Sequence, residues 1–113
     1  MAFVELREQG PDGTFGQSDV PKQGALIRSL FTGPLVLNQE FDAASAAQAV
    51  GEGRCDAISF GRDYISNPDL AERIAAGAAW SPNIDAPKSW YSPGPKGYID
   101  YPAMEQAFAA AAD

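Results

Sequence analysis

Short apolar runs alternate with amphipathic stretches along the chain. Residues 2–6 alternate apolar and polar positions, which is typical of a strand with one buried face. Residues 35–37 are instead a continuous apolar run, typical of a strand buried on both faces of a parallel sheet, and residues 56–60 are predicted to be a second short buried strand. Between and after these runs, the spacing of apolar positions predicts helices over residues 21–30, 43–52 and 69–76, with another from about residue 103.

Helix boundaries are marked by capping residues. Asp42 is the predicted N-cap of the second helix, and Asn67-Pro68 is predicted to start the third, which Gly77 ends. Gly24 lies inside the first predicted helix, where glycine is unfavourable.

Alternating strands and helices predict an α/β fold with parallel strands and right-handed crossovers. Three parallel strands alone would leave two open edges, and a complete (β/α)₈ barrel takes about 250 residues. We therefore expect the 113 residues to be an arc of a larger sheet. The chain also begins inside a predicted strand, as a fragment would.

Charge and composition limit the classes of partner that the chain could bind. The net charge of -7 argues against nucleic acid or an anionic membrane as a general partner, because both favour a basic face. No run is apolar and long enough for a membrane-spanning helix, and the N-terminus lacks a signal-peptide pattern. Cys55 is the single cysteine, predicted to be a packing residue, and a reduced cytoplasmic setting is expected.

The strongest candidate for chemistry follows the predicted strand at 56–60. Gly61 allows close approach of the backbone to a ligand, and Arg62 supplies a guanidinium fork suited to phosphate. Ligands of parallel α/β folds bind at the carboxyl ends of the strands, where Asn38 and Gln39 would add backbone donors. This corner is therefore a candidate phosphate site.

The candidate phosphate site also has a purely structural explanation, and so has a group of aromatic residues later in the chain. Gly61 would then only turn the chain, and Arg62 would pair with Asp63 or Asp69. A later group of aromatic side chains would anchor a tail to its domain or face a flat conjugated ligand. These are Trp90, Tyr91, Tyr98 and Tyr101.

Several kinds of catalytic site are excluded. The chain has no histidine, which rules out Ser–His and Cys–His nucleophile pairs and histidine metal sites. It has no GxGxxG or P-loop motif. The residues therefore supply no complete catalytic constellation and no metal site.

Residues 60–70, FGRDYISNPDL, followed by Arg73, resemble the FGR-x-[FY]-I-[AS]-NPDL-x-x-R segment of the Old Yellow Enzyme family. Trp90-Tyr91 and residues 97–102, GYIDYP, resemble that family's ending. Residues 2–8, 33–38 and 56–60 are similar to its sixth, seventh and eighth barrel strands, so the resemblance covers nearly the whole chain in order.

The resemblance implies the C-terminal arc of a (β/α)₈ TIM barrel, comprising strands 6–8 and a tail from about residue 78. Residues 1–113 would then be one partial FMN-binding domain. The implied activity is an FMN-dependent ene reductase, in which flavin reduced by NAD(P)H passes hydride to an activated C=C bond of an enone or nitroalkene.

Site residues follow from the resemblance position by position. The family's catalytic histidine, asparagine and tyrosine would belong to the complementary N-terminal portion, so no catalytic residue is expected here. The implied FMN-binding residues are Asn38, Gln39, Gly61, Arg62, Trp90 and Tyr91, with Phe15 and Tyr91 as substrate or lid residues.

The expected partners are the complementary barrel portion and a small activated alkene. One alternative is a stand-alone phosphate-binding, flavin-binding or structural module without catalysis. Another is a different barrel enzyme that binds a phosphorylated substrate.

Overall fold

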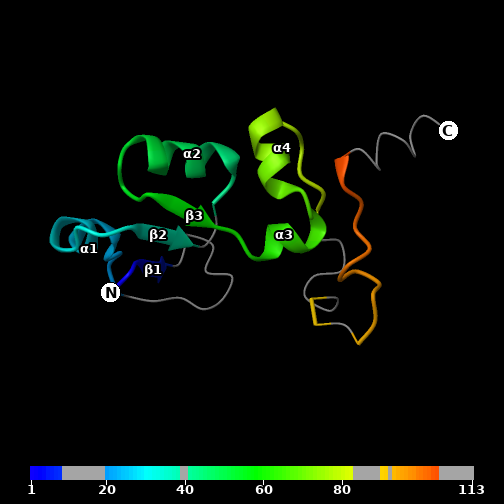
Figure 1. Cartoon of the computed structure of the whole chain (residues 1–113), viewed down its shortest axis with the longest axis horizontal. Helices are drawn as coiled ribbons and strands as arrows, with labels where there is room; N and C mark the ends of the chain where they lie inside the picture. The colour runs from blue at the N-terminus through cyan, green and yellow to red at the C-terminus, as the bar shows by residue number, and fades with distance from the viewer. Residues whose placement is uncertain (9–19, 39–40, 83–89, 92, 105–113) are drawn as a thin grey trace. The chain divides into compact units, whose positions relative to one another are not determined.

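The computed structural model describes residues 1–8, 20–38, 41–82, 90–91 and 93–104. The chain divides into two compact units, Met1–Phe60 and Gly61–Asp113, which are described separately below (Figure 1). In the described ranges no helix combines the length and the hydropathy that a membrane crossing requires.

The first unit is a three-stranded parallel sheet with two helices. β1 pairs with β2 and β2 with β3, both in parallel, which confirms the predicted pairing. Each strand is followed by a helical connection to the next, as a βαβ crossover requires. The elements are β1 (Val4–Arg7), α1 (Gly24–Leu30), β2 (Leu35–Asn38), α2 (Ala43–Gly51) and β3 (Ala57–Ser59).

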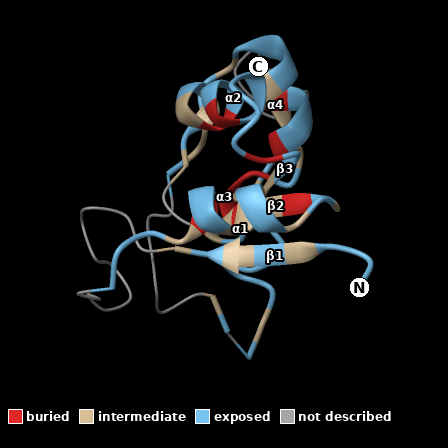
Figure 2. Cartoon of the chain, turned by 90° about the vertical axis from the view of Figure 1, so that its left-hand side faces the viewer, coloured by how far each residue is buried: buried red, intermediate tan, exposed pale blue. Residues whose placement is uncertain are grey.

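A small apolar core holds the helices against one face of this sheet. Leu35 and Leu37 of β2 are buried together with Ala49 of α2 and Cys55. The predicted packing role of Cys55 is confirmed, and burial raises the pKa of its thiol. Figure 2 shows the buried positions on β2 and on α2. Partly buried apolar side chains complete the core: Val4, Leu6, Ile27, Phe41 and Ile58.

The predicted cap of α2 is confirmed. The Asp42 carboxylate accepts the Ser45 backbone N–H at 2.7 Å, and the Ser45 hydroxyl oxygen accepts the Asp42 backbone N–H at 3.0 Å. These hydrogen bonds lower the pKa of Asp42. At the other end Gly53 has φ +75°, the left-handed conformation expected of a residue just past a helix.

α1 is shorter than the sequence predicts and begins at Gly24. Its first turn is capped by Glu8, whose carboxylate accepts the backbone N–H groups of Gln23 and Gly24. A Cβ at position 24 would lie 2.7 Å from Glu8 Oε1. A methyl group there would displace the carboxylate end of Glu8, so glycine permits its close approach, which accounts for a residue that helix propensity disfavours.

Gly24→Ala should push Glu8 away from the start of α1 and destabilise the protein by about 1–3 kcal/mol. Gly51→Ala is the matched control, because no atom of the described ranges lies within 4 Å of a Cβ at that helical glycine. The control should be neutral or slightly stabilising. Denaturant unfolding of both variants measures the difference, and equal midpoints would show that Glu8 does not cap the helix.

The second unit contains two short helices, α3 (Arg62–Ser66) and α4 (Leu70–Ala76). α3 was not predicted as a helix. Gly77 ends α4 with φ +63°, as predicted.

Asn67 does not start α4 as predicted, since the N-cap is Asp69. Asn67 is fully buried, and its amide donates to the carbonyls of Asp63 (2.8 Å) and Ser81 (3.1 Å). Its side-chain oxygen also accepts the Ser81 backbone N–H at 2.7 Å. Asn67 therefore joins α3 to the chain that follows α4.

A buried ion pair, Asp69–Arg73, connects α4 to the C-terminal segment. Arg73 is 6% exposed, and its Nε lies 2.8 Å from Asp69 Oδ1. Its other nitrogens donate to the carbonyls of Ala79 (2.8 Å) and Pro102 (3.3 Å). The second Asp69 oxygen accepts the Met104 backbone N–H at 2.7 Å. The helix predicted from about residue 103 lies almost entirely outside the described residues.

Acidic pH should weaken the contacts that hold the C-terminal segment to α4. The Arg73 guanidinium, followed by the Met104 N–H, lowers the pKa of Asp69. Its stabilising contribution is therefore complete above the unfolded-state pKa of about 4 and is lost as the pH falls through the lower folded-state value. We expect the hydrogen-exchange protection factor of the Met104 amide to fall several-fold over that window. Asp69→Ala, which removes both acceptor oxygens, should show low protection at all pH values. A wild-type protection factor independent of pH would contradict the assignment.

Candidate functional site

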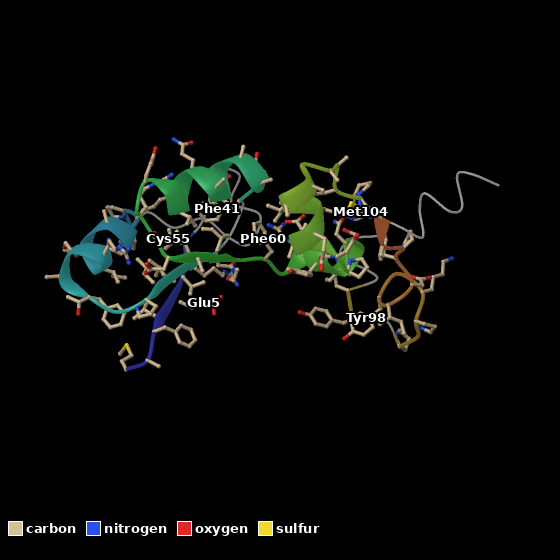
Figure 3. All side chains as sticks on the ribbon, turned by 45° about the horizontal axis from the view of Figure 1, so that its top comes forward. Glu5, Phe41, Cys55, Phe60, Tyr98 and Met104 are labelled. Atoms are coloured by element: carbon tan, nitrogen blue, oxygen red, sulfur yellow. The ribbon has the colours of Figure 1, made fainter. Side chains whose placement is uncertain are left out.

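The sheet of the first unit has two chemically different faces. Val4, Leu6 and Ile58 point to the core beneath the helices. In Figure 3, Glu5 lies on the opposite side of the strands from Phe41 and Cys55. The alternation of side chains along the paired strands defines this second face, which is half-buried to exposed. Its residues are Glu5, Arg7, Val36, Asn38, Ala57 and Ser59.

Polar side chains near the carboxyl ends of the strands form a hydrogen-bonded group. The Ser59 hydroxyl lies 2.6 Å from Glu5 Oε1. The Asn38 amide nitrogen lies 2.7 Å from the Ser59 hydroxyl and 3.0 Å from the Ser59 carbonyl oxygen. Asn38, a predicted site residue, is thus held by its side chain to the neighbouring strand.

Gly61 comes two residues after β3 and is the N-cap of α3. Its φ is −106°, which any residue adopts, and no atom of the described residues lies within 4 Å of a Cβ built there. Neither its backbone conformation nor packing against the described part of the chain therefore requires glycine. The open space fits the close approach of a phosphate group to the main chain.

Arg62 is the first residue of α3 and is half-buried. The sequence left open a pairing of Arg62 with Asp69, but Asp69 pairs with Arg73 instead. Burial raises the pKa of Asp63, and the positive charge of Arg62 opposes that rise. Arg62 is thus close enough to the Asp63 carboxyl group for its positive charge to affect the pKa of that group.

The remaining predicted residues differ in their surroundings. Trp90 is half-buried, whereas Tyr91 is 92% exposed. So exposed a ring does not pack against the described part of the chain, which argues against an anchoring role for Tyr91 there. Phe15 and Gln39 lie outside the described residues.

Three polar residues make several of the hydrogen bonds described above but were not singled out from the sequence. Glu5 was visible as the polar position in the alternating run at residues 2–6, which places it opposite the core. Ser59 lies within an apolar run and gave no separate signal. Arg73 was noted only as part of a motif, because its buried contacts depend on the folding of the distant residues 79 and 102.

Comparison with known proteins gives consistent matches, although no protein-family model matches the chain. A probable flavin mononucleotide-dependent alkene reductase of Leishmania infantum is 40% identical over 86 residues, 74% of this chain and 23% of that protein. A 12-oxophytodienoate reductase-like protein of Solanum lycopersicum is 35% identical over 108 residues, 95% of this chain and 28% of that protein. The chain thus spans about a quarter of the length of these relatives.

Solved structures agree with the sequence matches. The Old Yellow Enzyme homologue of Zymomonas mobilis matches with a TM-score of 0.82 and 46% identity, over 90% of this chain and 28% of that one. Morphinone reductase matches with a TM-score of 0.74 and 33% identity, over 91% of this chain and 27% of that one. The described α/β arrangement is therefore that of part of a TIM barrel. By sequence and by fold, the chain belongs to the Old Yellow Enzyme family and corresponds to a part of its members.

Proposed function

We propose that the chain forms strands 6–8 and the C-terminal tail of an FMN-dependent ene reductase barrel and supplies its flavin-phosphate site. The complementary N-terminal portion of the barrel is the partner that would supply the catalytic histidine, asparagine and tyrosine. The reductant would be NAD(P)H and the substrate a small alkene activated by a carbonyl or nitro group. A cytoplasmic location accords with these soluble reactants.

The observation that carries the proposal is the open space at Gly61 directly before Arg62. A glycine that neither its conformation nor packing against the described residues requires, followed by a guanidinium, suits a bound phosphate monoester. The Leishmania infantum relative is named as flavin mononucleotide-dependent, which makes FMN the phosphate ligand of choice.

Each residue has a distinct role in this proposal. The Arg62 guanidinium would neutralise the phosphate, and the Gly61 backbone N–H would donate to it. Asn38 and Gln39 would contribute mainly through their backbone. Trp90 and Tyr91 would lie beside the flavin and the substrate cavity, with Phe15 as a lid residue. Bound FMN would supply hydride transfer from NAD(P)H to the β-carbon of the alkene.

A hybrid barrel tests this function. It consists of the Zymomonas mobilis homologue with its matched segment replaced by this chain, and its assay is NADPH consumption with cyclohexenone. Turnover that depends on FMN is the expected result. A folded hybrid without turnover would argue against the reductase and for a binding or structural module.

Gly61→Ala separates ligand binding from folding. A methyl group should enter the space of the phosphate and weaken FMN binding to the hybrid by roughly tenfold, the effect of losing one charge-assisted hydrogen bond. The midpoint of thermal unfolding without flavin should not change, because the site is open in the chain. Gly51→Ala is the control, at an equally open glycine outside the proposed site. An FMN affinity equal to that of the control would remove Gly61 from the site.

A further inference from the structure

One polar side chain from each of the three strands takes part in a continuous hydrogen-bond chain. Ser59 is its centre, since its hydroxyl lies 2.6 Å from the Glu5 carboxylate and 2.7 Å from the Asn38 amide nitrogen. A carboxylate only accepts, so the single hydroxyl hydrogen of Ser59 is donated to Glu5. Ser59 Oγ is then an acceptor for Asn38.

This direction fixes the orientation of the Asn38 carboxamide. Its nitrogen donates to the Ser59 hydroxyl at 2.7 Å and to the Ser59 carbonyl at 3.0 Å, which uses both amide hydrogens. The Asn38 side chain therefore has no amide hydrogen left for an anion. Its remaining polar atom is an oxygen, which a phosphate would repel.

These hydrogen bonds lie at the ends of two neighbouring strands. Asn38 is the last residue of β2 and Ser59 the last of β3, and the two residues are already register partners in the sheet. The side-chain bonds therefore add a second constraint on the spacing of the strand ends. In the proposed function, the backbone of Asn38 at the end of β2 is among the groups that would hold the phosphate.

We propose that Glu5, acting through Ser59, is a positioning residue for the phosphate site. It orients the Ser59 hydroxyl, which in turn locks Asn38 and holds the ends of β2 and β3 at one spacing. The phosphate is then bound by main-chain N–H groups and not by the Asn38 side chain. This inference rests on the proposed function and identifies how part of that site is built.

The charge of Glu5 is not needed for this role. A glutamine oxygen accepts a hydroxyl hydrogen as a carboxylate does, whereas a negative charge on the same face of the sheet opposes a bound phosphate. Glu5→Gln should therefore keep the geometry, and it should bind FMN at least as tightly as the wild type does. Glu5→Ala removes the acceptor and frees Ser59.

The test compares FMN with riboflavin, which lacks the phosphate, in the hybrid barrel. Glu5→Ala and Ser59→Ala should each weaken FMN by roughly tenfold and leave riboflavin unchanged. Ser59→Thr should keep the wild-type preference for FMN over riboflavin, and Glu5→Gln should keep or increase it. A merely structural role would weaken both ligands together.

Each other outcome counts against the inference. Equal losses for FMN and riboflavin, or no loss in either alanine variant, would overturn the positioning role while the proposed function stands. If Ser59→Ala does not fold, the Glu5→Ala and Glu5→Gln pair decides the question, because Glu5→Gln keeps the size of the side chain and an acceptor oxygen whereas Glu5→Ala removes both. A wild-type hybrid that binds no FMN would overturn the proposed function and the inference with it.

Discussion

Arg62→Ala should weaken FMN binding to the hybrid barrel by about 100-fold, because two charge-assisted hydrogen bonds to the phosphate are lost at once. Arg62→Lys should lose about tenfold, since an ammonium keeps the charge but not the fork. Riboflavin should bind all three proteins equally. Quenching of flavin fluorescence on titration with protein measures both ligands.

Arg54→Ala is the control for this series. Arg54 is an exposed arginine paired with Glu52 on the first unit, and it has no place in the proposed site. Its removal should leave both affinities unchanged. If the Arg62 and Arg54 variants lose FMN equally, the effect is one of net charge, and Arg62 is not a phosphate ligand.

Arg73→Met should cause the largest loss of stability, about 2–4 kcal/mol, because it removes a buried cation and its hydrogen bonds. Two carbonyl groups, of Ala79 and Pro102, lose their donor, and Asp69 loses its partner. Methionine retains most of the apolar volume, so the loss reports the polar contacts. Denaturant unfolding of the hybrid barrel measures it.

Arg54→Met is the matched substitution at an exposed ion pair. The Arg54 and Glu52 side chains are 53% and 51% exposed, in contrast to 7% and 15% for Arg73 and Asp69. Exposed pairs contribute about 0–1 kcal/mol, so this variant should unfold near the wild-type midpoint. Similar losses in the two variants would show that Arg73 does not hold the C-terminal segment.

Hydrophobic patterning predicted the sheet because its signal is local. The run at residues 35–37 and the cap at Asp42 carry all the information that their elements need, and both are confirmed. The start of α1 was harder to predict, because its first turn depends on Glu8, which lies fifteen residues before Gln23 and just after β1. Asn67 was misassigned as a cap for the same reason, since Ser81 is its partner.

The candidate site likewise contains some residues that the sequence could reveal and others that it could not. Gly61 and Arg62 are neighbours in sequence and follow a strand, so a pattern with a known mechanism could find them. The hydrogen bond of Ser59 to Glu5 joins residues 54 apart, and only the register of the strands brings them together. The partners that would complete the barrel are not encoded in these residues, which is why the activity rests on homology.

The most direct test of the central claim is the amount of FMN that the hybrid barrel retains. Flavin released by heating the purified, folded hybrid can be counted against protein. Our account predicts close to one FMN per hybrid chain, with a strong preference over riboflavin. A folded, colourless hybrid that takes up no FMN when supplied with it would contradict the claim that this chain supplies the flavin-phosphate site.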